Sequence, residues 1–154
     1  MLPHVKPNDL VPDFEALDDE GQTVRLSDYL ARGPVVLFFY PKAMTAGCTA
    51  EACHFRDLAS EFEAFGAVPL GISADDVDRQ ARFREKERLG FPLLSDRSRQ
   101  VASAFGVKRW GPLPNKRATF VIDTDRRLLD VVVSETNMDA HADQALATLK
   151  AHKA

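Results

Sequence analysis

Two cysteines, Cys48 and Cys53, are the residues whose type and spacing point to chemistry in this sequence. Both lie in a segment from Thr45 to Phe65 whose apolar residues recur at helical spacing, and Gly66 ends the pattern. A thiol in the first turn of a helix lies beside unpaired backbone N–H groups and the positive end of the helix dipole, which favour the nucleophilic thiolate. We therefore expect Cys48, near the start of this helix, to be reactive.

The spacing of the two cysteines limits how they can meet. Cys48 falls on the apolar stripe and faces inward, whereas Cys53 is rotated from it by about 140° and faces outward. In an intact helix their Cα atoms are roughly 8.6 Å apart, but a disulfide spans at most about 6.8 Å. If the two ever bond, the first two turns of the helix must unwind, and the protein has two conformations linked to its redox state.

Other interpretations of the cysteines stay open on spacing alone. Most thiols in a reducing compartment are small buried hydrophobes, and Cys48 fits that description. Cys53 fits it less well, because an outward thiol buries little apolar surface. A metal site with His54 as a further ligand is disfavoured, because Cys53 and His54 point about 100° apart and the spacing matches no zinc pattern.

Length and composition exclude several classes of protein. The 154 residues are about the size of one domain, so we expect a single domain over 1–154. The hydrophobic share of 45% and the charged share of 28% are typical of a globular chain. The longest apolar run, 35–40, falls far short of the roughly 20 residues of a membrane span. The N-terminus has no secretory signal pattern, which predicts a cytoplasmic protein.

The net charge of −3 argues against a nucleic-acid partner. The basic residues occur as pairs, such as Lys108–Arg109, and we expect these pairs to be solvated surface.

The remaining pattern alternates strands with helices and predicts an α/β fold with a mixed sheet, parallel in the middle and antiparallel at the end. The run 34–40 is apolar throughout, which is typical of a strand covered on both faces, and we expect it to be the central strand. Ser27 and Asp28 offer a helix cap. The other expected strands are 14–17, 23–26, 68–72, 91–94, 117–122 and 128–133, and the other expected helices are 75–89, 97–105 and 139–150.

The residues around Cys48 resemble the active-site motif of the peroxiredoxins. Pro41, Thr45 and Cys48 have that motif's spacing and follow a hydrophobic strand, and a second cysteine five positions on resembles the Q type, the bacterioferritin comigratory proteins. The resemblance continues in the segments 21–28, 71–73, 91–96 and 117–123. It implies a thioredoxin-like fold, with a central mixed sheet flanked by helices and an N-terminal hairpin, and reduction of hydroperoxides.

The resemblance also implies a role for each matching residue. Cys48 corresponds to the peroxidatic cysteine and Cys53 to the resolving one. Thr45 corresponds to the hydroxyl that hydrogen-bonds the peroxide, Pro41 shields the pocket, and Arg117 supports the thiolate. Arginine stays charged at any relevant pH, and fixed donors around the reacting atoms lower the barrier to peroxide attack.

The implied cycle runs through sulfur alone. The Cys48 thiolate attacks a hydroperoxide and becomes a sulfenic acid, Cys53 converts it to a disulfide, and a dithiol partner such as thioredoxin reduces that bond. No metal or organic cofactor is needed. The Q-type resemblance favours a monomer.

The sequence differs from the family at two places, and two other functions are alternatives to this interpretation. Ala46 stands where many relatives have proline, and the segment 108–116 is shorter than in relatives. Trp110 in this segment is either a residue at the pocket rim or a packed side chain.

A thiol-disulfide exchange protein is the first rival, although such proteins usually have two residues between their cysteines. A redox-sensing regulator without turnover is the second.

Overall fold

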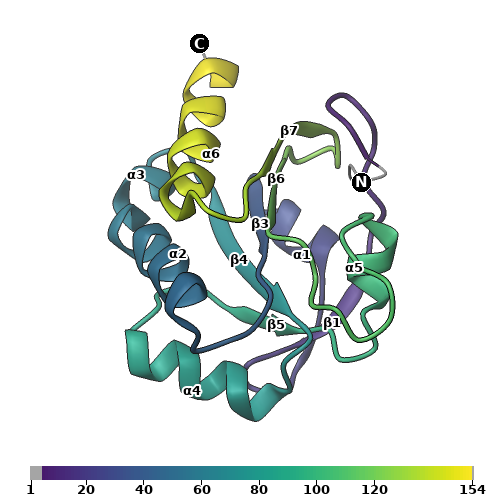
Figure 1. Ribbon diagram of the computed structural model, residues 1–154. Helices are drawn as coiled ribbons and strands as arrows, with labels where there is room; N and C mark the ends of the chain where they lie inside the picture. The colour runs from purple at the N-terminus through teal and green to yellow at the C-terminus, as the bar shows by residue number, and fades with distance from the viewer. Residues whose placement is uncertain (1–4, 154) are drawn as a thin grey trace.

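The chain folds around one seven-stranded sheet in the computed structural model, which describes residues 5–153 (Figure 1). The strands are β1 (Glu15–Asp18), β2 (Thr23–Arg25), β3 (Val35–Phe39), β4 (Val68–Ser73), β5 (Leu93–Ser95), β6 (Ala118–Ile122) and β7 (Leu128–Val133). Their order in the sheet is β2-β1-β5-β4-β3-β6-β7. The helices are α1 (Leu26–Leu30), α2 (Ala46–Asp57), α3 (Ala59–Glu63), α4 (Val77–Glu87), α5 (Gln100–Ala104) and α6 (Met138–Lys153).

The direction of the strands confirms the predicted mixed sheet. β3, β4 and β5 run parallel to one another, and every other neighbouring pair is antiparallel. β3, expected as the central strand, is an interior strand between β4 and β6, whereas β4 occupies the middle position. The two hairpins predicted at the beginning and near the end of the chain are β1–β2 and β6–β7.

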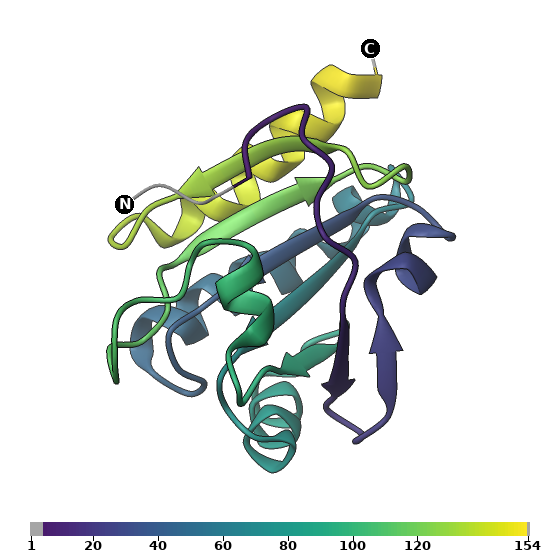
Figure 2. The same cartoon turned by 90° about the vertical axis from the view of Figure 1, so that its right-hand side faces the viewer.

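Helices cover both faces of the sheet, which explains the continuous apolar run of β3 (Figure 2). Val36 and Phe38 point to one side, where they pack with residues of α2, α4 and α6. Val35 and Leu37 point to the other side, against α1 and α5. Because successive side chains of a strand alternate between faces, a strand between two helical layers must be apolar at every position.

Two local expectations are wrong. The helix expected over 45–65 breaks at Leu58, whose backbone leaves the helical region, so that α2 and α3 are separate. The apolar spacing continues across the break and hides it. Ser27 and Asp28 do not precede α1 as a cap but lie within its first turn, and Arg25 occupies the capping position without a side-chain bond.

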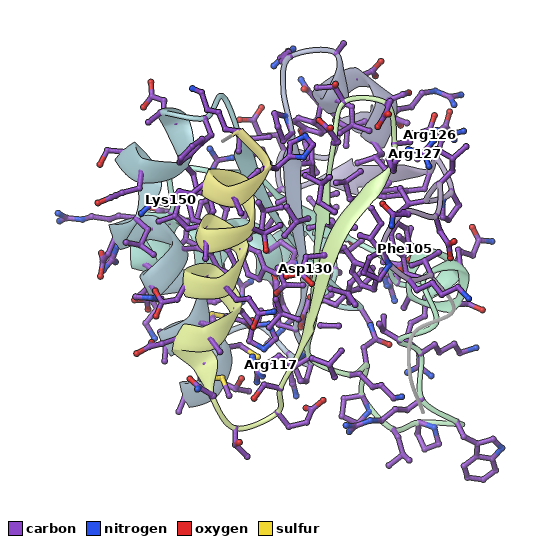
Figure 3. The ribbon with its side chains drawn as sticks, turned by 90° about the horizontal axis from the view of Figure 1, so that it is seen from above. Phe105, Arg117, Arg126, Arg127, Asp130 and Lys150 are labelled. Atoms are coloured by element: carbon purple, nitrogen blue, oxygen red, sulfur yellow. The ribbon has the colours of Figure 1, made fainter. Side chains whose placement is uncertain are left out.

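α6 closes the side of the sheet that holds α2. Asp130 on β7 accepts hydrogen bonds from Gln144 at 3.1 Å and from Thr148 at 2.8 Å, and Figure 3 shows Asp130 beside α6. The two helices α2 and α6 lie side by side (Figure 1). Within residues 5–153, every helix is too short or too polar to span a membrane.

Candidate active site

Cys48 lies in the first turn of α2, where sequence reasoning placed it. Its side chain is 1% exposed and belongs to the core cluster between α2 and the sheet. The first backbone hydrogen bond of the helix joins the Thr49 N–H to the Thr45 carbonyl, so the amides of residues 46–48 belong to the turn whose N–H groups have no partner within the helix. Cys48 therefore lies in the positive end of the helix dipole.

The loop that carries the chain from β3 into α2 is fixed by α4. The Asp75 carboxylate accepts the Ala43 N–H at 2.7 Å, and the Arg79 guanidinium donates both to Asp75 at 3.0 Å and to the Ala43 carbonyl at 3.2 Å. Met44 then turns through a left-handed conformation with φ 65° before the helix starts. These contacts set the point at which α2 begins and so place Cys48.

Arg117 is the charged group that reaches Cys48. It lies just before β6, it is 6% exposed, and its Nη2 is 3.5 Å from the Cys48 Sγ. Its backbone N–H donates to Glu135 at 2.9 Å. Figure 3 shows Arg117 near the N-terminal end of α6. The sequence-predicted pairing of this guanidinium with the thiol is thus present in the structure.

Gly47 leaves room for this approach. A Cβ at that position would lie 3.2 Å from the Arg117 Nη2 and 3.6 Å from the Met138 Sδ. A larger residue would therefore push against the guanidinium that approaches Cys48.

Two buried polar residues of this site were missed from the sequence. The Glu51 carboxylate, fully buried on α2, accepts from the Arg117 Nη1 at 2.7 Å. His141, fully buried on α6, has its Nδ1 3.5 Å from the other Glu51 oxygen. Burial raises the pKa of Glu51 to about 8, although the Arg117 charge acts in the opposite direction. One signal was available: Glu51 lies one helical turn after Cys48 and so shares its inward face.

Cys53 lies in a different environment. Its thiol is half-buried and not, as expected, turned freely outward, because the end of α4 covers it: Sγ is 3.5 Å from the Glu87 Oε1. Arg56 donates to the Glu87 carbonyl at 2.7 Å and holds the two helices together. Burial raises the pKa of the Cys53 thiol; the Arg56 charge acts in the opposite direction, and the hydrogen bond and charge of Glu87 add to the rise.

His54, considered above as a metal ligand, faces α6 instead. Its Nε2 is 2.7 Å from the Asp143 carboxylate. Within residues 5–153, no cluster of three or more histidine, cysteine or acidic side chains has an arrangement suited to a metal ion.

Thr45 and Pro41 lie in the same loop as the start of α2. The exposed Thr45 occupies the capping position, and its hydroxyl donates to the Lys42 carbonyl at 2.8 Å. Pro41 lines a cavity of about 360 Å³ together with Arg99 and Pro114. Trp110, in the neighbouring loop, is 85% exposed and does not pack into the core.

The sequence and the fold match known proteins. A family model described as the AhpC/TSA family matches residues 7–131. The structure of Peroxidoxin BcpB from Mycobacterium tuberculosis is 60% identical, with a TM-score of 0.93, covering 96% of this chain and 98% of that one. Peroxiredoxin Bcp of Bacillus subtilis is 42% identical over 145 residues, covering 90% of this chain and 91% of the relative. A structure of the Xanthomonas campestris Bacterioferritin Comigratory Protein, from work on its alkyl peroxide reduction activity, is 32% identical with a TM-score of 0.84, covering 92% of both chains.

Proposed function

We propose that Cys48 is the peroxidatic cysteine of this chain. The chain belongs to the AhpC/TSA family and is a Q-type, Bcp-like peroxiredoxin with a thioredoxin-like fold. It therefore reduces peroxides with electrons from a thiol. The observation that carries the proposal is the 3.5 Å contact between the Arg117 guanidinium and the buried Cys48 sulfur in the first turn of α2. A cation and a helix N-terminus both favour the thiolate, the form that attacks.

The first step is attack of the Cys48 thiolate on one oxygen of a hydroperoxide. The O–O bond breaks, the sulfur becomes a sulfenic acid, and the other oxygen takes up a proton and leaves as water or an alcohol. In our proposal the Thr45 hydroxyl binds the peroxide, and Arg117 stabilises the negative charge that moves from sulfur to the leaving oxygen. Pro41 keeps bulk water away from the loop side of the sulfur.

The second step joins the two cysteines. The Cys53 thiol attacks the sulfenic acid, a Cys48–Cys53 disulfide forms, and water leaves. Because the Cα atoms of residues at this spacing are roughly 8.6 Å apart in a helix, the first turns of α2 unwind, and Cys53 leaves its contact with Glu87. A dithiol protein such as thioredoxin then reduces the disulfide, and α2 forms again. The enzyme works as a monomer in this cycle.

The test is a matched pair of variants in the same helix. Cys48→Ser is expected to abolish peroxide consumption in an assay coupled to thioredoxin and its reductase. Cys53→Ser is expected to consume about one equivalent of peroxide per chain and then stop, because its sulfenic acid has no partner within the chain.

Retention of activity by the Cys48→Ser variant would reject the assignment of the peroxidatic cysteine. Full turnover of the Cys53→Ser variant with thioredoxin would reject the intramolecular disulfide. Insulin reduction faster than peroxide reduction would instead support a disulfide exchange protein.

A further inference from the structure

One cation faces two buried acids in this site. The two terminal nitrogens of Arg117 divide between them: Nη1 is 2.7 Å from the Glu51 Oε1, and Nη2 is 3.5 Å from the Cys48 Sγ. Both Cys48 and Glu51 are within 1% of full burial. A buried anion without a counter-charge is costly, so one positive charge supports one full negative charge and not two.

The second oxygen of Glu51 has no donor in its surroundings. Among residues 5–153, no hydrogen-bond partner lies within reach of the Glu51 Oε2, and the His141 Nδ1 lies 3.5 Å from it. A buried carboxylate oxygen needs a donor, whereas a protonated one brings its own hydrogen.

His141 offers no hydrogen to Glu51. Its Nε2 is 2.8 Å from the Ser134 carbonyl, which only accepts, so the ring proton is on Nε2. Burial and the Arg117 charge lower the pKa of His141, which keeps the ring neutral. Its Nδ1 is therefore an acceptor, and its single lone pair receives the Thr119 hydroxyl at 2.7 Å, so His141 supplies no donor to Glu51.

We propose that Glu51 is a redox-linked proton carrier: it holds a proton while Cys48 is a thiolate and releases that proton when the sulfur loses its charge. The inference rests on the proposed role of Cys48. Glu51 acts through Arg117 and is a positioning residue. The raised pKa of Glu51, about 8, agrees with a protonated carboxyl in the reduced protein.

The first step of the reaction is balanced in protons. Oxidation of the thiolate to a neutral sulfenic acid consumes one proton, which leaves with the alcohol or water. Arg117 then faces Glu51 alone, Glu51 ionises, and one proton is released. Uptake and release cancel, so the charge of the buried site stays constant through the reaction.

The charged and titratable groups that face Glu51 come from three directions. Cys48 lies on the same helix, Arg117 precedes β6, and His141 lies on α6. Glu135, in the segment before α6, adds a more distant negative charge that raises the pKa of Glu51. Of these, Cys48 is the group whose charge changes in catalysis.

Infrared spectroscopy of the two serine variants tests the linkage without the disulfide. In reduced Cys53→Ser, Cys48 and Glu51 share the Arg117 cation, and the carbonyl stretch of a protonated carboxyl is expected at pH 7. In Cys48→Ser the competing anion is absent, and that band is expected to be lost. Glu51→Gln in the Cys53→Ser background assigns the band by removing it, and Glu85→Gln, at an exposed position on α4, is a control in which the band stays.

The neutral Gln variant gives a second, independent readout. Because glutamine imitates the protonated carboxyl, Glu51→Gln is expected to leave the alkylation rate of Cys48 by iodoacetamide at pH 7 at least equal to that of the unaltered site. A slower rate would mean that a charged Glu51 is required, and would overturn the proposal.

The remaining outcomes are equally decisive. A carboxyl band present in both serine variants, or in neither, overturns the linkage between Glu51 and Cys48. These failures are distinct from failure of the proposed function, which is seen when Cys48→Ser still consumes peroxide.

Discussion

The two cysteines of α2 are five residues apart but lie in opposite electrostatic surroundings. Cys48 has a guanidinium at 3.5 Å and the N-terminal end of the helix around it. Cys53 has a carboxylate at 3.5 Å, from the end of α4. The cation favours a thiolate, and the carboxylate favours a thiol.

This difference agrees with the order of reaction proposed for the two sulfurs. The sulfur that attacks first must be ionised, whereas the one that resolves must remain intact while peroxide is present. In our account Glu87 keeps Cys53 protonated and covered until α2 unwinds. Secondary structure alone does not create this division, since both residues belong to one regular helix. It comes from Arg117 and Glu87, which approach that helix from different elements.

Removal of the Arg117 cation should reduce the difference in reactivity between Cys48 and Cys53 most. Arg117→Met is expected to slow alkylation of Cys48 at pH 7 by about 10²-fold, the typical loss when one donor to an anion is deleted. Cys53 should react at its original rate in the same protein. Iodoacetamide labelling followed by peptide mass spectrometry measures both rates.

Arg109→Met is the matched control, because Arg109 pairs with Glu135 at 3.2 Å and does not contact Cys48. Arg117→Lys keeps the charge and should lose less than the methionine variant. Equal rates in all three variants would contradict the role of Arg117.

Removal of the carboxylate at Cys53 should have a smaller effect in the opposite direction. Glu87→Gln removes a charge that raises the pKa of Cys53, so a larger thiolate fraction is present at neutral pH. Alkylation of Cys53 in the Cys48→Ser background is expected to be about two- to fivefold faster, as for a partly exposed charge interaction of ~0.5–1 kcal/mol. The gain should vanish at high pH, where Cys53 is ionised in both proteins.

The exposed Glu85, on the same helix, provides the control. Glu85→Gln should leave the Cys53 rate unchanged, and a gain as large as that of Glu87→Gln would point to net charge in place of the contact.

The smallest effect concerns the ease with which α2 unwinds. Ala46 is the first residue of α2, a position that suits proline, and Thr45 before it has φ −84° and ψ 160°, which proline tolerates in its neighbour. Ala46→Pro should therefore stabilise the reduced helix by ~0.4–1 kcal/mol. Amide hydrogen exchange of the peptide covering 46–54 should be slower in this variant than in the natural sequence, and faster exchange would show that proline strains the loop.

The sequence alone predicted much of the fold. The strand 128–133 was placed to the residue, because it is rich in apolar, β-branched residues and the turn 123–126 precedes it. The break at Leu58 was not predicted, because Phe62 continues the apolar spacing of α2 into α3. A change in backbone direction that preserves the buried face leaves no trace in the hydrophobic pattern.

The site was predicted where the residues lie close in sequence and missed where the fold brings them together. Cys48 follows from its place at a helix start. Glu51 and His141 were missed because isolated polar residues on a helix normally face water. Their burial depends on partners from elsewhere in the fold: Arg117, just before β6, contacts Glu51, and Thr119, within β6, contacts His141. Glu87 was missed because only the tertiary fold brings the end of α4 against Cys53.

Peptide mapping of the protein after one equivalent of peroxide tests the central claim most directly. The account predicts one intramolecular bond between Cys48 and Cys53, formed in the intact chain and removed by thioredoxin. Oxidation that ends with both thiols unlinked, or with disulfides between separate chains, would contradict it.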